Sequence, residues 1–148
     1  MCGICGIWDP AGFSEFDPQE VAHAMGLAIE HRGPDGEGIW QEDDLLLVHR
    51  RLAVIDTSSA GDQPMISPCG RFVIVFNGEI YNHQTIRDEL EGDKQAPNWR
   101  GHSDTETILA AFQAYGVKGT LQKLVGMFSI TLWDRQDRTL VLARDRAG

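Results

Sequence analysis

Two short segments joined by a polar turn, at residues 127–133 and 139–143, place the strongest constraint on the fold. In the first, Phe128, Ile130 and Leu132 occupy every second position, which is the period of a half-buried β-strand. The pair predicts a hairpin and therefore mainly antiparallel sheets. Further strands are expected at 3–8, 39–40, 45–55 and 71–76. The last is apolar without alternation, so we expect it to be buried on both faces and to end at Asn77-Gly78.

Three helices are expected between these strands. The first begins after Asp17, an N-cap residue that is followed by Pro18 at the first helical position. One of its faces is apolar and should cover a core; it consists of Val21, Met25, Ala28 and Ile29. Between this helix and the next strand, residues 31–38 contain three glycines and a proline, which predicts a structured loop.

The other two helices follow the buried strand. Asn82 is expected to cap a short helix that buries Ile86 and Leu90. Residues 103–106 read Ser-Asp-Thr-Glu, a capping box that opens the third helix, and Gly116 supplies its C-terminal stop. Helices that cover antiparallel sheets give an α+β layered fold.

Length, charge and cysteine content narrow the function classes. The 148 residues suffice for one domain with a sizeable core. The net charge of −9 argues against a nucleic-acid or anionic-membrane surface, because both require a basic patch. No run approaches the roughly 20 apolar residues of a spanning helix, and no signal peptide opens the chain. Three cysteines without an export signal predict reduced thiols and a cytoplasmic location. No metal site is expected, because Cys69 alone remains to complement the pair Cys2 and Cys5.

The first two residues, Met1-Cys2, suggest a nucleophile. Initiator methionine is usually removed before a small residue, and its removal would give Cys2 both a thiol and a free α-amine. A thiol is strongly nucleophilic only as thiolate, with a free pKa of about 8.5. An α-amine, with a pKa of roughly 7.7–8.0, can serve as its base. The pair therefore predicts an N-terminal nucleophile; the alternative is a cysteine on a frayed chain end.

Asn77 and Gly78 allow two interpretations. The dipeptide is typical of a hairpin turn. However, residues 79–82 are not an obvious strand to pair with residues 71–76. In the other interpretation, the Asn77 side chain and the Gly78 N–H form an oxyanion hole, where glycine allows close approach of the backbone.

Arg51 and Asp104 are charged residues at positions where a purely structural role is also plausible. Arg51 lies inside an apolar strand, either in an edge-strand salt bridge or as a bidentate clamp for a carboxylate. Asp104 lies in the first turn of a helix, either as a partner of the helix dipole or as a fixed carboxylate for an ammonium group. A thiol, oxyanion donors, a cation and an anion together suit one ligand, glutamine, which has an α-amino-acid head and a carboxamide.

Motifs that follow one another along nearly the whole chain support this interpretation. They are Met1-Cys2-Gly3-Ile4, His31-Arg32-Gly33-Pro34-Asp35, Arg51-Leu52-Ala53-Val54-Ile55-Asp56, Gln63-Pro64-Met65, Asn77-Gly78-Glu79-Ile80-Tyr81-Asn82, Ser103-Asp104-Thr105-Glu106, Gly126-Met127-Phe128 and Arg144-Asp145-Arg146-Ala147-Gly148. With these motifs the chain resembles the glutaminase domain of glutamine-hydrolysing asparagine synthetases, which are class II glutamine amidotransferases.

The resemblance implies a fold and a set of roles. The fold is a four-layer αββα sandwich of two mainly antiparallel sheets between helix layers. The nucleophile would be Cys2, with its own amine as base. The oxyanion hole would be formed by Asn77 and Gly78. Arg51 would bind the α-carboxylate of L-glutamine. Its amino end would be bound by Asp104 and Glu79, with backbone groups of Gly78 and Val54 helping.

The resemblance also implies parts beyond this chain. In the family, the segment matching residues 144–148 is followed by further strands and then by an ATP- and Mg²⁺-dependent synthetase domain. We therefore expect residues 1–148 to be one amidotransferase domain, a fragment whose sheet is incomplete at the C-terminus. The glutaminase step would need no cofactor, the synthetase domain would act in cis, and a homodimer is compatible with this arrangement. His102 replaces a glycine common in relatives; it either narrows the pocket mouth or is a solvated loop residue.

Two rival functions stay open at this point. Cys2-Gly3-Ile4-Cys5 is a C-x-x-C motif, which in another context marks a redox or zinc module. A redox motif normally follows a strand and opens a helix, whereas this one begins the chain. The other rival is a truncated or degenerate domain that binds glutamine without hydrolysing it.

Overall fold

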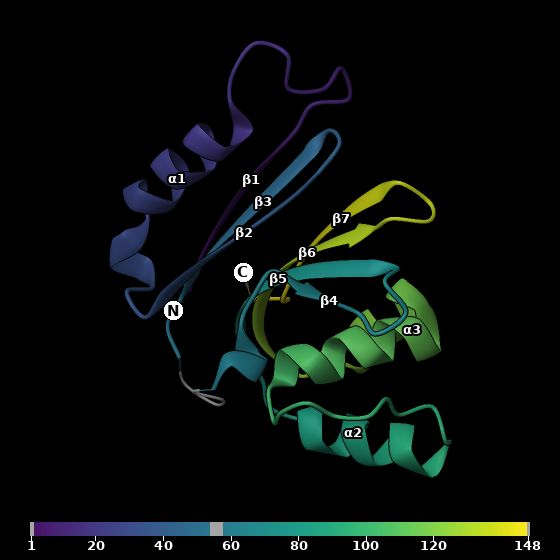
Figure 1. Ribbon diagram of the computed structural model, residues 1–148. Coiled ribbons are helices and arrows are strands. Elements are labelled where there is room, and N and C mark those ends of the chain that lie inside the picture. Colours follow the sequence, from purple (N-terminus) through teal and green to yellow (C-terminus); the bar gives the residue numbers. More distant parts are fainter. Residues whose placement is uncertain (1, 54–57, 148) are drawn as a thin grey trace.

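Two antiparallel sheets lie face to face, with one helix covering the outer face of the first and two helices covering the outer face of the second (Figure 1). The computed structural model describes residues 2–53 and 58–147. In chain order the elements are β1 (Gly3–Trp8), α1 (Pro18–Ala28), η1 (Glu30–Arg32), β2 (Gly36–Glu42), β3 (Leu45–Arg51), η2 (Ser59–Gly61), β4 (Met65–Ile66), β5 (Phe72–Ile80), α2 (His83–Gly92), α3 (Asp104–Lys123), β6 (Gly126–Asp134) and β7 (Thr139–Arg144).

The strand order confirms the predicted α+β sandwich. The first sheet has the order β1-β3-β2 and the second the order β4-β5-β6-β7, and every pair of neighbours is antiparallel. The predicted hairpin near the end of the chain is β6–β7. No helix within residues 2–53 and 58–147 is long and apolar enough to cross a membrane.

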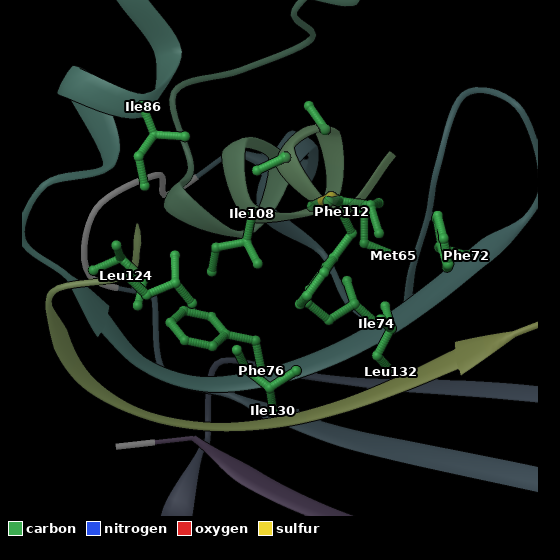
Figure 2. Packing of buried hydrophobic residues seen from close by; sticks show 14 of the residues in the cluster. Met65, Phe72, Ile74, Phe76, Ile86, Ile108, Phe112, Leu124, Ile130 and Leu132 are labelled. Carbon is green, nitrogen blue, oxygen red and sulfur yellow. The ribbon is translucent and has the colours of Figure 1, made fainter. Parts of the chain in front are cut away.

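Three apolar clusters separate the four layers. Ala22 of α1 packs on Leu46 and Val48 of β3 between the helix and the first sheet. The space between the sheets is filled by residues from both, namely Leu45, Leu47, Val73, Val75 and Trp133. The largest cluster lies between the second sheet and the helices; Figure 2 shows Ile108 and Phe112 of α3 above Phe76 and Ile130 of the sheet.

The predicted end of the buried strand at Asn77-Gly78 is wrong. β5 continues through both residues to Ile80, and β6 pairs with its whole length. Gly78 makes this possible because its φ of +152° is rarely adopted by other residues. A Cβ atom there would lie 2.1 Å from the carbonyl oxygen of Met127 on β6. Asn77 and Gly78 are therefore strand residues, and the hairpin-turn interpretation is also wrong.

The packing face of α1 differs in part from the predicted one. The buried residues of this helix are Ala22 and Gly26, whereas Ala28 is exposed. The small side chains bring the helix so close to the first sheet that a Cβ atom on Gly26 would lie 2.1 Å from Glu37 Oε1. The sequence pattern favoured the larger apolar residues, but the sheet selects the smaller ones. In the loop before the sheet, residues 36–38 belong to β2 instead of the predicted loop.

Two of the predicted caps use different partners. Asn82 stands at the N-cap of α2 without a side-chain capping bond; its amide instead holds the turn after α3, through Lys123 O and Val125 N. Ser103 caps α3 as predicted, but Glu106 does not complete the capping box. Its carboxylate accepts hydrogen bonds from the N–H groups of Arg100 and Gly101, and so fixes the loop before the helix.

The later part of α3 and the strand β6 show where sequence patterns succeed and where they are overridden. Gly116, with a φ of +69°, interrupts α3 as predicted, but a further helical segment follows to Lys123. On β6, Trp133 lies on the face opposite to Phe128, Ile130 and Leu132, which a half-buried strand would leave exposed. It is nevertheless only 1% exposed. The first sheet covers that face, so the strand is buried on both sides at this end.

Candidate active site

The layer between the sheets changes from apolar to polar at one end. Leu45 and Leu47 of β3 and Val73 and Val75 of β5 belong to the inter-sheet cluster. Since alternate residues of a strand share a face, the same faces continue to His49 and Arg51 on β3 and to Asn77 and Glu79 on β5. Ile4 of β1 also packs on this cluster, which places Cys2 on the same side.

The polar residues at this end of the inter-sheet layer line one pocket of about 230 Å³. Its walls come from both sheets and from the start of α3. They are Cys2, His49, Arg51, Leu52, Ala53, Gly61, Gln63, Phe76, Asn77, Gly78, Glu79, Ser103, Asp104, Thr105 and Met127. Six of the residues predicted for the site are thus brought together from separate parts of the chain.

Cys2 is held by the backbone that follows β3. The Leu52 N–H donates to Cys2 Sγ over 3.3 Å, and the sulfur lies 3.6 Å from the Leu52 carbonyl oxygen. Asp35 fixes this backbone on both sides, because its N–H donates to Arg51 O and its carboxylate accepts from the Ala53 N–H, each over 2.9 Å. The backbone of Leu52 therefore fixes the position of the sulfur in the pocket wall.

The edge of β5 presents a row of backbone N–H groups to the pocket. Phe76 N–H donates to Gln63 Oε1 over 2.6 Å, and Ile80 N–H donates to Asp104 Oδ2 over 3.0 Å. Gly78 lies between them and opposite Phe128, which uses its own backbone groups to bond Asp145 on the far side of β6. Hydrogen-bonded and non-hydrogen-bonded pairs alternate along an antiparallel ladder, and Gly78 with Phe128 is a non-hydrogen-bonded pair. The Gly78 N–H therefore points away from β6, to the same side as the N–H groups of Phe76 and Ile80. Between two bonded positions, this edge leaves a donor for a ligand.

Asn77 extends this donor site toward Cys2. Its side chain lies on the inter-sheet face of β5, and Oδ1 is buried with no hydrogen bond inside the part of the chain that the structure describes. Buried polar atoms of proteins are normally paired, so an unpaired one in a pocket wall indicates a polar ligand. The unpaired Oδ1 can accept a hydrogen bond from a ligand N–H. The Nδ2–H of the same carboxamide, together with the Gly78 N–H, can donate to an oxygen that gains negative charge.

Asp104 is a buried carboxylate, 5% exposed, at the start of α3. One oxygen accepts from Ile80 N–H and the other from Thr105 N–H. Burial raises the pKa of this carboxyl above its usual value, while the two backbone donors and the nearby His83 oppose that rise. Asp104 is therefore both a partner of the helix N-terminus and an anion in the pocket wall. The two interpretations of this residue do not exclude each other.

Arg51 lies on β3, which is the central strand of its sheet and not an edge strand. Its side chain is 13% exposed, and Nη1 lies 2.5 Å from Oδ1 of Asp62, whose side chain is 63% exposed. The salt bridge of the structural interpretation therefore exists, but it lies in the pocket wall. A guanidinium in this position, partly exposed in the pocket wall, can also bind the carboxylate of a ligand.

Comparison with known proteins agrees with this geometry. A family model described as "Glutamine amidotransferase domain" matches residues 1–148. The chain belongs to the glutamine amidotransferase family. It is 39% identical over 147 residues to asparagine synthetase [glutamine-hydrolyzing] 1 of Arabidopsis thaliana, covering 98% of this chain and 24% of the relative. It is 36% identical over 148 residues to asparagine synthetase B [glutamine-hydrolyzing] of Escherichia coli, covering 100% of this chain and 26% of the relative.

The amidotransferase domain thus spans about a quarter of the length of the curated relatives it matches. A solved structure supports the fold. Glutamine phosphoribosylpyrophosphate amidotransferase from Bacillus subtilis, complexed with ADP and GMP, superimposes with a TM-score of 0.71 at 19% identity, over 97% of this chain and 37% of that chain. The resemblance inferred from the motifs is therefore confirmed for both family and fold.

Some predicted site residues have a different outcome. Val54 falls outside the residues that the structure describes, although its neighbours Leu52 and Ala53 line the pocket of the amidotransferase domain. His102 is exposed and does not belong to the pocket wall.

Cys2 and Cys5 do not form a pair. Cys2 lines the pocket, whereas Cys5 packs in the layer between α1 and the first sheet. Residues three apart on a strand point to opposite faces, so this C-x-x-C cannot act as a redox unit. Among the described residues, no group of three or more His, Cys, Asp or Glu side chains could hold a metal ion.

Sequence reasoning missed His49, Gln63, Thr105 and Met127 as pocket residues. A signal existed for His49, because it lies two positions before Arg51 and thus shares its strand face. Gln63 was noted only as part of the Gln63-Pro64-Met65 motif and was given no role. Nothing near it in the sequence indicates one, because its side-chain contacts are made with distant parts of the chain.

Proposed function

We propose that this domain hydrolyses L-glutamine to L-glutamate and ammonia, with Cys2 as nucleophile after removal of Met1. One observation carries the proposal: the sulfur of Cys2, the donors of Asn77 and Gly78, and the charges of Arg51 and Asp104 line a single pocket. A non-catalytic glutamine-binding domain would need the two charges but not the thiol or the oxyanion donors.

The α-amino-acid head of glutamine and its side-chain carboxamide bind at different walls of the pocket. Arg51 binds the α-carboxylate, for which its planar guanidinium is suited. Asp104 and Glu79 bind the α-ammonium group. The carboxamide then extends along β5 toward Cys2, which is held by the backbone of Leu52.

The reaction proceeds through a thioester. The α-amine of Cys2 accepts the thiol proton, and the sulfur forms a bond to the carboxamide carbon. The carbonyl oxygen becomes an oxyanion bound by Asn77 and the Gly78 N–H. The C–N bond then breaks, and the proton on the α-ammonium passes to the leaving nitrogen as ammonia departs. Water, deprotonated by the same amine, attacks the γ-glutamyl thioester and releases glutamate and the thiol.

We further propose that the ammonia is used by an ATP- and Mg²⁺-dependent synthetase domain in the same polypeptide, which would amidate aspartate or another carboxylate. Support comes from the names of the relatives, which are glutamine-hydrolysing asparagine synthetases, and from their greater length. No residue of this domain is assigned to ATP or Mg²⁺. A chelator should therefore leave glutamine hydrolysis unchanged and abolish amide synthesis in the whole protein. A cytoplasmic location belongs to the same proposal and is supported by three free cysteines.

The test is replacement of the nucleophile. Cys2→Ala should abolish glutamine hydrolysis, while Cys69→Ala, at an exposed cysteine outside the pocket, should retain it. Intact mass should show loss of Met1 and one adduct of a glutamine-like diazoketone, absent from Cys2→Ala. Hydrolysis by Cys2→Ala at the wild-type rate would overturn the proposal.

A further inference from the structure

Gln63 has a buried amide with both ends paired to separate parts of the fold. The residue is 8% exposed. Oε1 accepts from the N–H of Phe76 on β5 over 2.6 Å, and Nε2 donates to Thr105 Oγ1 on α3 over 3.1 Å. Because a backbone N–H can only donate, the orientation of the amide is fixed.

The main chain of Gln63 rests on the other sheet. A Cβ atom on Gly38 of β2 would lie 1.8 Å from the carbonyl oxygen of Gln63, so the two backbones are in direct contact. Gly38 pairs with His49 of β3, another residue of the pocket wall. One residue thus touches the first sheet with its backbone, and both the second sheet and α3 with its side chain.

The reacting groups are distributed over the same three parts. Cys2 precedes β1 of the first sheet, Asn77 and Gly78 belong to β5 of the second, and Asp104 begins α3. The sheets contact each other mainly through apolar side chains, and hydrophobic contact is non-directional. Directional hydrogen bonds next to the pocket therefore have the larger effect on how the two sheets are aligned there.

We propose that Gln63 is a positioning residue of the glutaminase site, which holds the oxyanion donors of β5 in line with Cys2 and with the start of α3. This rests on the proposed function. Gln63 bonds the N–H of Phe76, and Asp104 bonds that of Ile80. The two bonds fix the strand edge on either side of Gly78 and leave the Gly78 N–H for the oxyanion.

Gln63→Met tests the proposal, since it keeps the length of the side chain and removes both hydrogen bonds. A shift of about 1 Å at a reacting group can cost on the order of a hundredfold in rate. We therefore expect kcat for glutamine to fall about tenfold to a hundredfold, with KM changed less than about threefold, because Arg51 and Asp104 keep their charges.

Asn82→Leu is the matched control. Asn82 also has both ends of its amide bonded to other segments, Lys123 O and Val125 N, but it does not line the pocket. It should lose a similar amount of stability while kcat stays within about twofold of the wild type. Thr105→Val and Thr105→Ser form a second pair. The valine removes only the acceptor for Gln63 and should lower kcat, whereas the serine keeps a hydroxyl and should restore it.

Hydrogen exchange gives a readout that does not depend on turnover. In Gln63→Met the amide of Phe76 should exchange about tenfold faster, as expected for one lost hydrogen bond, and the amide of Val125 should not change. Normal exchange at Phe76, or faster exchange with unchanged kcat, would overturn the positioning role. If the wild-type protein does not hydrolyse glutamine, the proposed function fails, while exchange at Phe76 and Gly78 still decides whether Gln63 fixes this strand edge.

Discussion

Arg51 and Asp62 form an ion pair in the wall of the pocket, with Nη1 and Oδ1 2.5 Å apart. The carboxylate of Asp62 thus binds the same guanidinium that is proposed to bind the α-carboxylate of glutamine. Asp62 lies largely in solvent, and exposed pairs contribute only about 0.2–1 kcal/mol. A substrate carboxylate can therefore displace it at small cost.

Removal of this competitor should strengthen substrate binding. We expect Asp62→Ala to lower KM for glutamine about twofold to fivefold, in line with the energy of such a pair, and to leave kcat unchanged. Steady-state kinetics of glutamate formation measure both constants. Arg51→Lys is the reference, because it loses the planar fork and should raise KM at least tenfold, or by about 1.4 kcal/mol. A higher KM in Asp62→Ala would show that Asp62 orients Arg51 instead.

Gly78→Ala should impair both folding and the oxyanion site. The new Cβ atom would meet Met127 O at 2.1 Å, and the φ of +152° is unfavourable for alanine. Strained backbone of this kind costs about 1–3 kcal/mol. Displacement of the Gly78 N–H should lower kcat by about 10²–10³. Gly92→Ala at the end of α2 is the control, because a Cβ atom there has no neighbour within 4 Å. Urea unfolding measures the stability of both variants, and steady-state kinetics measure their kcat. Equal stability and equal kcat in the two variants would contradict the prediction.

Asp104→Asn should raise KM for glutamine more than it changes kcat. The charge that attracts the α-ammonium is lost, and one of the two N–H donors, from Ile80 and Thr105, meets an NH₂ group instead of an oxygen. Loss of such a charged hydrogen bond costs about 1.5–3 kcal/mol, or roughly tenfold to a hundredfold in KM. Glu91→Gln, at an exposed position on α2 outside the pocket, is the control.

The pH dependence of KM should also report on Asp104. Its pKa is raised mainly by burial, so on acidification this carboxylate takes up a proton before an ordinary aspartate does. Since only the ionised form attracts an ammonium group, KM should rise as the pH falls through that raised pKa. Asp104→Asn should have a flat KM over the same range. A parallel rise of KM in both proteins would assign the effect to another group.

His49 should make the stability depend on pH between about 6.5 and 4. Its pKa falls from 6.5 to about 4, first because of burial and then because of Arg51, while the backbone of Phe76 and the charge of Asp62 act in the opposite direction. The unfolded chain therefore binds a proton at higher pH than the native protein. The associated stability is present above pH 6.5 and is lost as the pH falls toward 4. The amount is on the order of 3 kcal/mol.

Denaturant unfolding at pH 7 and pH 4 measures this loss. His49→Gln cannot take up a proton and should lose about 3 kcal/mol less than the wild type between these pH values. His31→Gln, at an exposed histidine, should behave like the wild type. An unchanged pH dependence in His49→Gln would show that other groups cause the acid sensitivity.

Much of the fold could be predicted because its signals are local. Asp17 with Pro18 and Ser103 with Glu106 mark helix starts through capping bonds that span two or three residues, and these starts are correct. The β6–β7 hairpin likewise follows from alternation around a short turn. The site residues were inferred from their side-chain chemistry and from the motifs. The structure adds that six of them line one pocket.

The errors share one physical cause, which is that partners far apart in the sequence override local preference. β5 continues through Asn77-Gly78 because β6 pairs with it. Trp133 is buried because the first sheet covers its face. Asn82 carries the right side chain for capping, but its amide bonds the distant turn after α3 instead. Glu106 is the exception among these errors, because its carboxylate bonds the N–H groups of the loop just before its own helix.

The sequence by itself therefore determined where most strands lie, though not where they end, together with the helix starts, the chemical types of the site residues and the family. Only the tertiary structure decided that Cys2, Arg51 and Asn77 lie in one pocket between the two sheets. It also decided that Asp62 forms an ion pair with Arg51, and that Gln63 bonds both β5 and α3 beside the pocket. The reason is that backbone propensities and caps act over a few residues, whereas the alignment of two sheets depends on contacts between residues that are distant in the chain.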